Sequence, residues 1–574
     1  MAFNPVLVSS QWLSQCASAL RNADAKAFGD LFLPGGWLRD ILVFTWDIRA
    51  LEGRKDVTAY LGDRLRDAQI EDVRLNDTPH LAPRAYTVPM SAQTGVEFAF
   101  TFECQHGHGR GYVRLAPDSD GAYRAFAVLA ELADLRGHEE LGTLPPADQS
   151  AETNPHVIIV GGAQTGLQVA ARFKRMNIPT LVIERNARVG DNWRQRYPTL
   201  ALNTIRRHHT LLYEPYPSDW PEFTPRDKLA DWLEHYAAAQ NLAVWTSSEL
   251  APRPTYDPTT RRWDVTVVRA GVAVKLRPAH IVLATGTLGR PHVPAVPGME
   301  GFRGRVVHSA RFGGGAACAG MRAVVVGAGN SAADICEDLA LGGAAGVTMV
   351  QRSPTCVVTR DFFCAPLRAA WPEDVPLDVL DFRFVSTGFG LLKTLAIEDQ
   401  AAAWEANGEL YEKLRKGGVS LQFGPEGQVL YPRVLEQFGG YWMDKGTSDL
   451  IADGRIKVKS LVSLKCFTKD SLILSDGTEL PADVVVFAPS STGYHYIRET
   501  NIELLGEDVI NQTGEVFGLD TEGEIKGSYR PCGHPGLWFA TGGFPTSRCL
   551  SKPLALQIKA IELGIMSSDG GRLD

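Results

Sequence analysis

Two glycine-rich turns are the stretches of this sequence whose residue types and spacing most clearly indicate chemistry. The first follows a short apolar stretch, 156–160, and reads Gly161-Gly162-Ala163-Gln164-Thr165-Gly166. The second follows another apolar stretch, 323–326, and reads Gly327-Ala328-Gly329-Asn330-Ser331-Ala332. Small residues between a strand and a helix let the backbone amides of the helix N-terminus approach a pyrophosphate. The sequence therefore predicts two dinucleotide-binding sites in one chain.

The residues around the first turn complete a nucleotide-binding pattern. A helix pattern follows at 167–176, and the next strand pattern, 180–183, ends in Glu184 and Arg185. An acid in this position takes the ribose hydroxyls of a dinucleotide. Ala163 is a departure, because it adds a methyl group where the second glycine of the pattern belongs. The order of strand, turn, helix, strand and acid still predicts a binding site.

The second turn carries a different signal after its next strand pattern, 347–350. That strand ends in Gln351, Arg352 and Ser353 instead of an acid. An arginine suits the 2′-phosphate of NADPH, whereas an acid would repel it. Ala332 replaces the third glycine, which is tolerable where a helix packs on a strand. The second turn therefore predicts an NADPH site rather than an NADH site.

A spaced set of residues lies between the two turns: Phe302, Gly304, His308 and Phe312. This spacing resembles the FxGxxxHxxx(Y/F) signature of the flavin-containing monooxygenases. Related Baeyer–Villiger monooxygenases usually close the motif with Trp, where this chain has Phe312. Taken alone, the spacing would also fit a structural turn with a buried histidine. Its position between two nucleotide-binding patterns favours the monooxygenase family.

The resemblance implies a class B flavin monooxygenase with FAD on the first turn and NADPH on the second. In such enzymes NADPH reduces the flavin, dioxygen adds at the flavin C4a carbon, and one oxygen atom passes to a small organic substrate. The expected reactions are N- or S-oxygenation or the oxidative decarboxylation of a keto acid. The cofactors carry this chemistry, so no catalytic triad is expected.

The resemblance also assigns residues to the flavin. The stretch from residue 190 to 221 resembles the segment that wraps the flavin ring, and Asn203 falls where animal members carry an asparagine near the reactive flavin edge. His308 is placed near the bound nucleotide, which gives two catalytic candidates, Asn203 and His308. Further FAD contacts are expected from Gly190, Asn192, Trp193 and, near the end of the chain, Gly542. An alternative is that Trp193 is an ordinary core aromatic and that Asn203 lies in an ordinary turn.

Three rival functions remain open at this point. A Baeyer–Villiger reaction on a ketone or aldehyde is the closest one. A disulfide reductase is disfavoured, because no closely spaced cysteine pair lies beside the flavin pattern. A non-catalytic flavoprotein scaffold is the third, since Ala163 and Pro489 both depart from the family pattern.

Composition narrows the broad class. A chain of 574 residues is too long for one hydrophobic core. The net charge of −8 gives no basic face for nucleic acid. The nine cysteines are scattered without metal-ligand spacing, which indicates reduced thiols in a cytoplasmic protein with no metal site. No apolar run approaches the ~20 residues of a transmembrane helix.

The elements expected before the first turn form a separate module. Helix patterns come first and alternating strand patterns afterwards, which indicates an α+β unit. The order is similar to the cone-shaped fold of nuclear transport factor, ketosteroid isomerase and SnoaL-type cyclases. That resemblance implies homodimerisation or a cover over the flavin domain, and it makes catalysis by Asp40, Asp47 and His106 a less favoured role.

We therefore expect an α/β fold with two dinucleotide-binding Rossmann-like domains (three-layer ββα), preceded by the α+β cone domain. The expected divisions are the cone domain at 1–136, a linker at 137–155, an FAD-binding domain at 156–307 and 465–574, and an NADPH-binding domain at 308–464. Strands at 451–462 and 471–486 are expected to return the chain to the FAD sheet. Aromatic clusters within 354–428 are expected to line a substrate cavity, with dioxygen as the second substrate.

Overall fold

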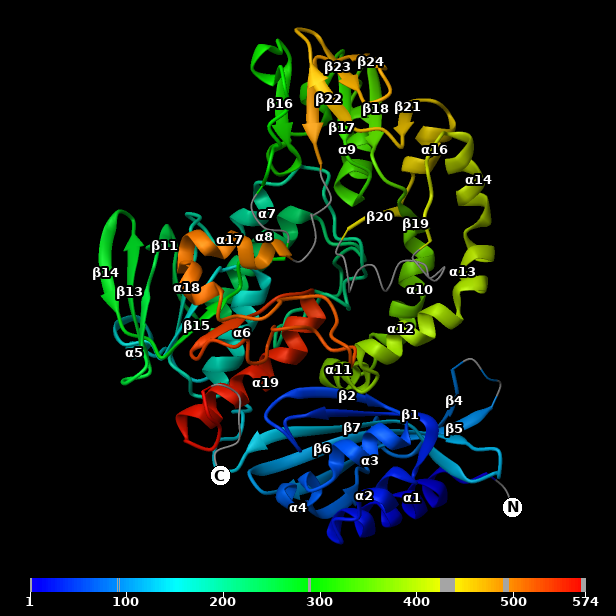
Figure 1. Cartoon of the computed structure of the whole chain (residues 1–574), viewed down its shortest axis with the longest axis vertical. Helices are drawn as coiled ribbons and strands as arrows, with labels where there is room; N and C mark the ends of the chain where they lie inside the picture. The colour runs from blue at the N-terminus through cyan, green and yellow to red at the C-terminus, as the bar shows by residue number, and fades with distance from the viewer. Residues whose placement is uncertain are drawn as a thin grey trace.

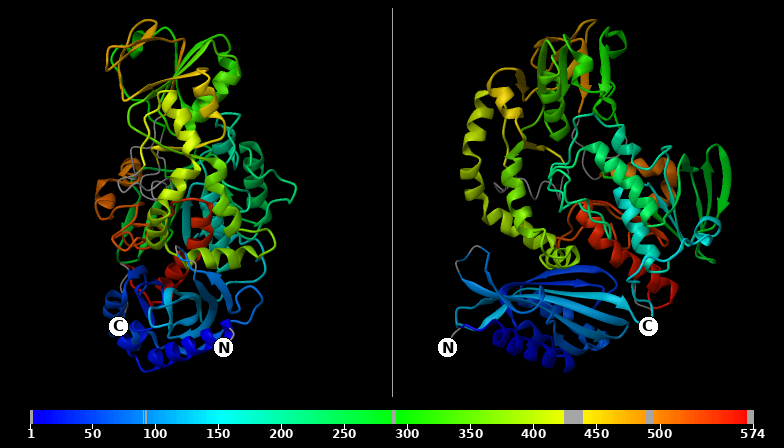
Figure 2. Two further views of the ribbon diagram at one scale, coloured as in Figure 1. Left: turned by 90° about the vertical axis from the view of Figure 1, so that its right-hand side faces the viewer. Right: turned by 180° about the vertical axis from the view of Figure 1, so that it is seen from behind.

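The computed structural model describes residues 3–89, 91, 93–287, 291–423, 439–488 and 495–568. Its three parts follow one another along the long axis of the molecule (Figure 1). The N-terminal module lies at one end, the first nucleotide-binding sheet lies in the middle, and the second sheet lies at the other end. Both rotated views show the same order (Figure 2).

The N-terminal module combines helices with one curved sheet. Its helices are α1 (Pro5–Arg21), α2 (Ala25–Gly29), α3 (Arg54–Leu61) and α4 (Arg64–Ala68). Its strands are β1 (Phe32–Ile41), β2 (Ile48–Glu52), β3 (Glu71–Leu75), β4 (Arg84–Thr87), β5 (Thr94–Cys104), β6 (Gly107–Pro117) and β7 (Tyr123–Leu135). The sheet order is β2-β1-β7-β6-β5-β3, with β4 paired to β5. The helices lie on one face and leave the other face to the rest of the chain (Figure 1). The predicted α+β arrangement is present, and its membership of the cone-shaped group stays a prediction.

The first nucleotide-binding sheet is parallel throughout. Its order is β10-β9-β8-β15-β26, from β8 (Val157–Val160), β9 (Thr180–Ile183), β10 (Ala243–Trp245), β15 (His280–Leu283) and β26 (Leu537–Phe539). The runs VIIV, TLVI, HIVL and LWF are almost wholly buried, as expected when helices cover both faces of a parallel sheet. Helix α6 (Gln164–Arg175) packs beside the C-terminal helix α19 (Phe544–Glu562), and α8 (Arg226–Ala239) lies next to α6. Between β10 and β15, a separate antiparallel sheet is formed by β11 (Ser248–Leu250), β12 (Thr255–Asp257), β13 (Arg262–Arg269) and β14 (Val272–Leu276).

The second sheet is also parallel and corrects one expectation. Its order is β16-β25-β17-β18-β21, from β16 (Arg305–His308), β17 (Arg322–Val326), β18 (Gly346–Gln351), β21 (Ile456–Ser460) and β25 (Val484–Phe487). We expected the strands at 451–462 and 471–486 to return to the FAD sheet. Instead β21 pairs with β18, and β25 pairs with β16 on one side and β17 on the other. The intervening strands β22 (Leu464–Phe467), β23 (Ser471–Leu474) and β24 (Glu479–Pro481) form a small sheet that shares a core with β17 and β25. Of the described strands after β21, only β26 belongs to the first sheet.

A helical arm connects the second sheet to the N-terminal module along one side of the molecule (Figures 1 and 2). It consists of α10 (Arg360–Ala370), α11 (Leu377–Val385), α12 (Phe389–Glu398), α13 (Gln400–Ala406) and α14 (Gly408–Lys416). Strands β19 (Cys356–Thr359) and β20 (Tyr441–Asp444) pair at its base, and α9 (Asn330–Leu341) and α16 (Thr447–Ala452) pack beside it.

Ion pairs fix the open face of the N-terminal module to the flavin side of the molecule. Arg39 on β1 pairs with Glu524 at 2.7 Å, and both side chains are buried, with 6% and 2% exposed. Arg49 pairs with Glu522, and Arg530 pairs with Asp47 at 2.6 Å. Burying one partner without the other would leave an unpaired charge, so these pairs hold the two surfaces in register.

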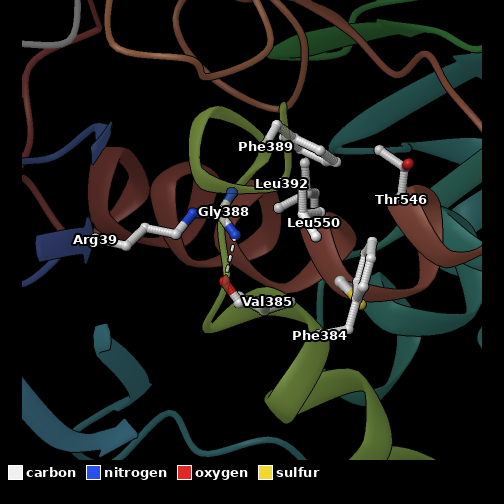
Figure 3. A pocket seen from close by; sticks show the side chains of 9 residues that line it. Arg39, Phe384, Val385, Gly388, Phe389, Leu392, Thr546 and Leu550 are labelled. Atoms are coloured by element: carbon white, nitrogen blue, oxygen red, sulfur yellow. Dashed lines mark hydrogen bonds between the residues drawn. The ribbon is translucent and has the colours of Figure 1, made fainter. Parts of the chain in front are cut away.

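The same arginine also reaches the helical arm. The Arg39 side chain points toward the turn between α11 and α12, and Nη1 donates to the Val385 carbonyl at 2.6 Å (Figure 3). Phe384, Phe389, Leu392 and Leu550 surround a cavity of only about 10 Å³ there. A space of this size holds about one water molecule. This junction is therefore an interface and not a ligand site.

The buried carboxylate of Asp40 has a structural role inside the N-terminal module. The Asp40 carboxylate accepts from the Tyr60 hydroxyl at 2.6 Å and from the Val43 backbone amide at 2.9 Å. Burial raises the pKa of Asp40 to about 6 against these hydrogen bonds. Asp47 does not join this cluster, because its carboxylate pairs with Arg530 outside the module. His106 lies against Trp46, with ring centroids 5.4 Å apart.

The expected linker is partly fixed in place. Its Glu140 forms ion pairs with Arg172 on α6 and with Lys552 on α19. A short helix, α5 (Ser150–Thr153), precedes β8. The connection therefore adds to the contacts between module and flavin domain.

Candidate active site

The first glycine turn has the close backbone approach that a dinucleotide site requires. Gly161 has φ +110°, and a Cβ atom there would lie 2.5 Å from the Ala284 carbonyl oxygen. A Cβ at Gly166 would lie 1.9 Å from the Gly161 carbonyl oxygen. Glycine is therefore required at both positions. Helix α6 begins at Gln164, so Thr165 and Gly166 already belong to its first turn.

Ala163 is compatible with this turn. It is the N-cap of α6 and has φ −91° and ψ −171°, an extended conformation open to any residue. No side chain caps the helix, so its first amides are left for a ligand. A pyrophosphate fits this arrangement. Ala163 is therefore compatible with dinucleotide binding, although the family pattern has glycine there.

Glu184 lies directly against the turn at the end of β9. Its Oε2 accepts from the Gly162 amide at 2.8 Å, and its Oε1 accepts from the Asn186 amide at 2.8 Å. The side chain is buried, whereas the neighbouring Arg185 is exposed. A fixed carboxylate at this edge fits the ribose of a dinucleotide.

The segment after Glu184 folds back over the start of α6. Gly190 has φ +89°, and a Cβ there would lie 2.3 Å from the Ala230 carbonyl oxygen on α8. The short helix α7 (Asp191–Arg194) follows and carries Asn192 and Trp193, both half-buried. Trp193 Nε1 donates to Gln164 Oε1 at 3.2 Å. The structure thus brings Asn192 and Trp193 to the first turn.

The second glycine turn repeats the geometry of the first. Gly327 has φ +137°, and a Cβ there would lie 2.0 Å from the Ala488 carbonyl oxygen. Helix α9 begins with Asn330, and its N-cap Gly329 has no side-chain cap. Asn330 Oδ1 accepts from the Met443 amide at 2.9 Å. Ser331 follows in the first turn of α9, and Ala332 is fully buried at the helix–sheet contact.

The end of β18 presents a cation beside this turn. Gln351 is buried and exchanges two hydrogen bonds with the Ser420 backbone, at 2.8 and 2.9 Å. Arg352 and Ser353 are exposed. Arg352 forms no ion pair with any residue that the structure describes. Its guanidinium is therefore available to a phosphate.

His308 lies at the same sheet edge. The strand register places it beside Phe487, which pairs in turn with Val326, the residue before the second turn. Its Nδ1 accepts from the Ala310 amide at 3.0 Å. Partial burial lowers the pKa of His308, and the nearby charges of Arg196 and His292 lower it further. The imidazole is accordingly neutral at neutral pH.

A buried contact that the sequence analysis did not assign joins the two nucleotide regions. The Tyr197 hydroxyl donates to Asp334 Oδ2 on α9 at 2.7 Å, and Lys445 pairs with the same carboxylate at 3.0 Å. Burial and the Asp334 charge raise the pKa of Tyr197 well above its ordinary value. This contact fixes the segment after α7 against the second sheet.

Asn203 lies in the segment that leads from this contact toward α10. It is half-buried, and its backbone carbonyl accepts from Cys364 Sγ on α10 at 3.5 Å. Half-buried His208 and buried His209 follow. Burial lowers the pKa of His209 to about 3 and the pKa of His208 well below its ordinary value, so both imidazoles are neutral at neutral pH.

Arg548 on α19, which the sequence did not indicate as a site residue, binds the backbone of the segment after Asn203. Its Nη1 donates to the Thr210 carbonyl at 2.6 Å and to the His208 carbonyl at 3.1 Å. The same guanidinium pairs with Asp381 on α11 at 2.5 and 2.7 Å. Gly542, with φ +109°, lies two residues before α19 begins. No spacing in the sequence links Arg548 to Asp381, which lies 167 residues away.

Pro489, a departure noted in the sequence, lies outside the described residues.

Among the described helices, none combines the length and apolar character needed to cross a bilayer.

The model of the flavin-binding monooxygenase-like family matches residues 186–517, which is more than half of the chain. The chain belongs to this family. This membership confirms the predicted class, a flavoprotein monooxygenase using FAD and NADPH, and it argues against a disulfide reductase or a non-catalytic scaffold.

Relatives of this monooxygenase include members of two groups. The chain is 30% identical over 356 residues to the indole-3-pyruvate monooxygenase YUCCA1 of Oryza sativa subsp. japonica, covering 61% of this chain and 79% of the relative. It is 27% identical over 361 residues to a Baeyer–Villiger monooxygenase of Streptomyces coelicolor, covering 59% and 64%. Cyclohexanone monooxygenase from Rhodococcus sp. Phi1 has a similar structure, with a TM-score of 0.50 and 15% identity over 72% of this chain and 85% of that one. That likeness shows a shared fold.

The first turn leads to a direct test of flavin binding. We expect Gly161→Ala to purify with much less FAD than the wild type, because the added methyl must displace Ala284 or the turn itself. Gly271→Ala is the matched control, since Gly271 also has positive φ (+85°) but no atom lies within 4 Å of its Cβ position. The measurement is the flavin-to-protein absorbance ratio of each purified variant. Equal flavin content in both variants would show that FAD does not depend on the first turn.

Proposed function

We propose that this monooxygenase acts on small 2-oxo acids by oxidative decarboxylation. The observation that supports this most strongly is the 30% identity to an indole-3-pyruvate monooxygenase across 79% of that protein. Indole-3-pyruvate is itself a 2-oxo acid. The proposal narrows the family's chemistry to one substrate class.

The proposed reaction balances with the two cofactors. A 2-oxo acid R–CO–COO⁻ reacts with O₂, NADPH and H⁺ to give R–COO⁻, CO₂, NADP⁺ and H₂O. A bond forms between the former oxo carbon and one oxygen atom of O₂, and the bond to the carboxylate carbon breaks. NADPH supplies the two electrons that reduce the other oxygen atom to water.

FAD supplies the redox and oxygen chemistry when it is bound, and the residues of this chain position it. We assign FAD to the first turn and to the segments that fold over it: Gly161, Gly162, Ala163, Gln164, Thr165, Gly166, Glu184, Arg185, Gly190, Asn192, Trp193 and Gly542. We assign NADPH to the second turn and the end of β18: Gly327, Gly329, Asn330, Ser331, Ala332, Arg352 and Ser353. The uncapped helices α6 and α9 and the unpaired Arg352 support both assignments.

Asn203 and His308 are the proposed catalytic contacts. The Asn203 amide would donate and accept hydrogen bonds at the reacting edge without adding a charge. The neutral imidazole of His308 would lie beside the nucleotide without repelling a cationic nicotinamide. Support comes from the place of His308 at the edge of the second turn and from the half-buried position of Asn203.

The three parts of the chain are proposed with the expected divisions, with two changes. The NADPH-binding domain begins before β16 instead of at residue 308, and the FAD-binding domain resumes after β25 instead of at residue 465. The ion pairs of Arg39, Arg49 and Arg530 support a cover over the flavin domain as the role of the N-terminal module. A cytoplasmic location is supported by the nine cysteines, none of which forms a disulfide with another described residue.

Product analysis under ¹⁸O₂ tests the proposed reaction. We expect phenylpyruvate and NADPH to give phenylacetate with one labelled oxygen atom and unlabelled CO₂, together with one NADPH consumed per product. Mass spectrometry of the acid and of the released gas gives the answer.

A Baeyer–Villiger enzyme would behave differently in the same assay. Phenylacetone would be converted to a labelled ester, while phenylpyruvate would leave NADPH oxidation unstimulated. A sulfide converted to its sulfoxide would indicate heteroatom oxygenation. Either pattern without phenylacetate would contradict oxidative decarboxylation.

The placement of Asn203 has its own test. We expect Asn203→Ala to keep FAD and to oxidise NADPH within about tenfold of the wild-type rate, while the share of electrons recovered as hydrogen peroxide rises. Loss of a hydrogen-bond donor where charge develops costs ~2.7–4 kcal/mol in other enzymes. A peroxidase-coupled assay for hydrogen peroxide, run alongside NADPH absorbance, measures this share of electrons. An unchanged share of peroxide would make Asn203 a structural residue.

A further inference from the structure

We propose that the substrate binds in a cavity beside Asn203 and that Arg207 anchors its carboxylate. The cavity has a volume of about 430 Å³ and lies between the segment 205–222 and the C-terminal end of α10. Small-molecule sites in proteins commonly occupy ~300–1,000 Å³. This inference rests on the proposed function, because it names the residue that would recognise a 2-oxo acid.

The cavity adjoins the segment that carries the catalytic candidate. Ile205, two residues after Asn203, forms part of its wall, and α10 forms the opposite wall. Cys364 on α10 donates to the Asn203 carbonyl, so the two walls contact each other at the position of Asn203. A substrate in this cavity would therefore lie beside Asn203.

The charges of the cavity leave one cation without a counterion. Arg206 pairs with Glu373 at 2.8 Å, and Arg368 pairs with Glu222 at 2.6 Å. Arg207 has no carboxylate partner among the described residues. The lining of three arginines and two glutamates thus has a net charge of +1.

The Arg207 side chain is also short of hydrogen-bond acceptors. Its Nη2 donates to the Val375 carbonyl, but its Nε is buried and has no partner among the described residues. A buried donor without a partner is costly. A carboxylate that accepts from the Nε side of the guanidinium would satisfy it and match the planar geometry of arginine.

The remaining wall residues fit the apolar side chain of a substrate. Trp371 is held by a hydrogen bond from its Nε1 to Asp381 at 3.3 Å, and it meets His208 edge-on at 4.9 Å. Trp220 stacks on Tyr216 with ring centroids 5.0 Å apart, and Pro372 also lines the cavity. The cavity therefore fits a small acid with an aromatic or other apolar side chain.

The test compares phenylpyruvate with phenylacetone, which carries a methyl group in place of the carboxylate. In the FAD-loaded full-length protein, we expect Arg207→Met to raise KM for phenylpyruvate roughly ten- to a hundredfold, the effect of losing a charged hydrogen bond. KM for NADPH should not change, and any activity on phenylacetone should be retained. Arg207→Lys should restore part of the affinity for phenylpyruvate.

Arg368→Met is the matched control, because Arg368 lines the same cavity but has its charge compensated. We expect it to change the KM values of both carbon substrates by similar factors. Flavin content and thermal unfolding of each variant show that it is folded, and calorimetric binding of phenylpyruvate to oxidised holoenzyme gives a readout without turnover.

The experiment distinguishes failure of the Arg207 anchor from failure of the proposed function. If the wild type converts phenylpyruvate but Arg207→Met binds it as well as Arg368→Met does, the anchor is wrong while the proposed function stands. The anchor is also wrong if Arg207→Met raises KM for NADPH instead, because the anion would then be a nucleotide phosphate. If the wild type converts phenylacetone and not phenylpyruvate, the proposed function itself has failed.

Discussion

The buried ion pair between Arg548 and Asp381 is the constraint on which the shape of the candidate site depends. Arg548 is 1% exposed and comes from the C-terminal helix, while Asp381 comes from the helical arm of the second domain. The same guanidinium also donates from Nη1 to the backbone carbonyls of His208 and Thr210. Removing one partner of such a pair typically costs ~3–5 kcal/mol, since a charge is left buried and unpaired.

This pair lies at the centre of a continuous set of contacts. On one side, Trp371 of the proposed substrate cavity donates to Asp381. On the other side, α11 and the turn after it receive Arg110, Arg114 and Arg39 from the N-terminal sheet. The N-terminal module therefore contacts the arm that forms one wall of the cavity, although it contributes no residue to the cavity lining itself. A module with this many polar contacts to the arm is a fixed part of the protein's architecture.

Local patterns predicted the nucleotide-binding elements well. A strand, a glycine turn and a helix lie within about twenty residues of one another, so Gly161, Glu184 and Gly327 could be assigned from spacing alone. The short run Val484–Phe487 could not be placed, because an apolar run of four residues fits either parallel sheet and only its strand partners decide. The fold resemblance did not distinguish Asp40, which is buried against Tyr60, from Asp47, which pairs with Arg530 across the interface. Arg548, Asp381 and Arg207 carried no signal, since their partners depend on contacts between segments far apart in the chain.

The central claim is that NADPH on the second turn reduces FAD on the first, with Arg352 selecting the phosphorylated nucleotide. Anaerobic mixing of the FAD-loaded protein with NADPH or NADH, followed by the loss of visible flavin absorbance, tests it most directly. We expect NADPH to reduce the flavin completely. In Arg352→Ala the half-saturating NADPH concentration should rise roughly ten- to a hundredfold, while that of NADH stays nearly the same. Flavin that remains oxidised in excess NADPH, or an equal effect of the substitution on both nucleotides, would contradict the claim.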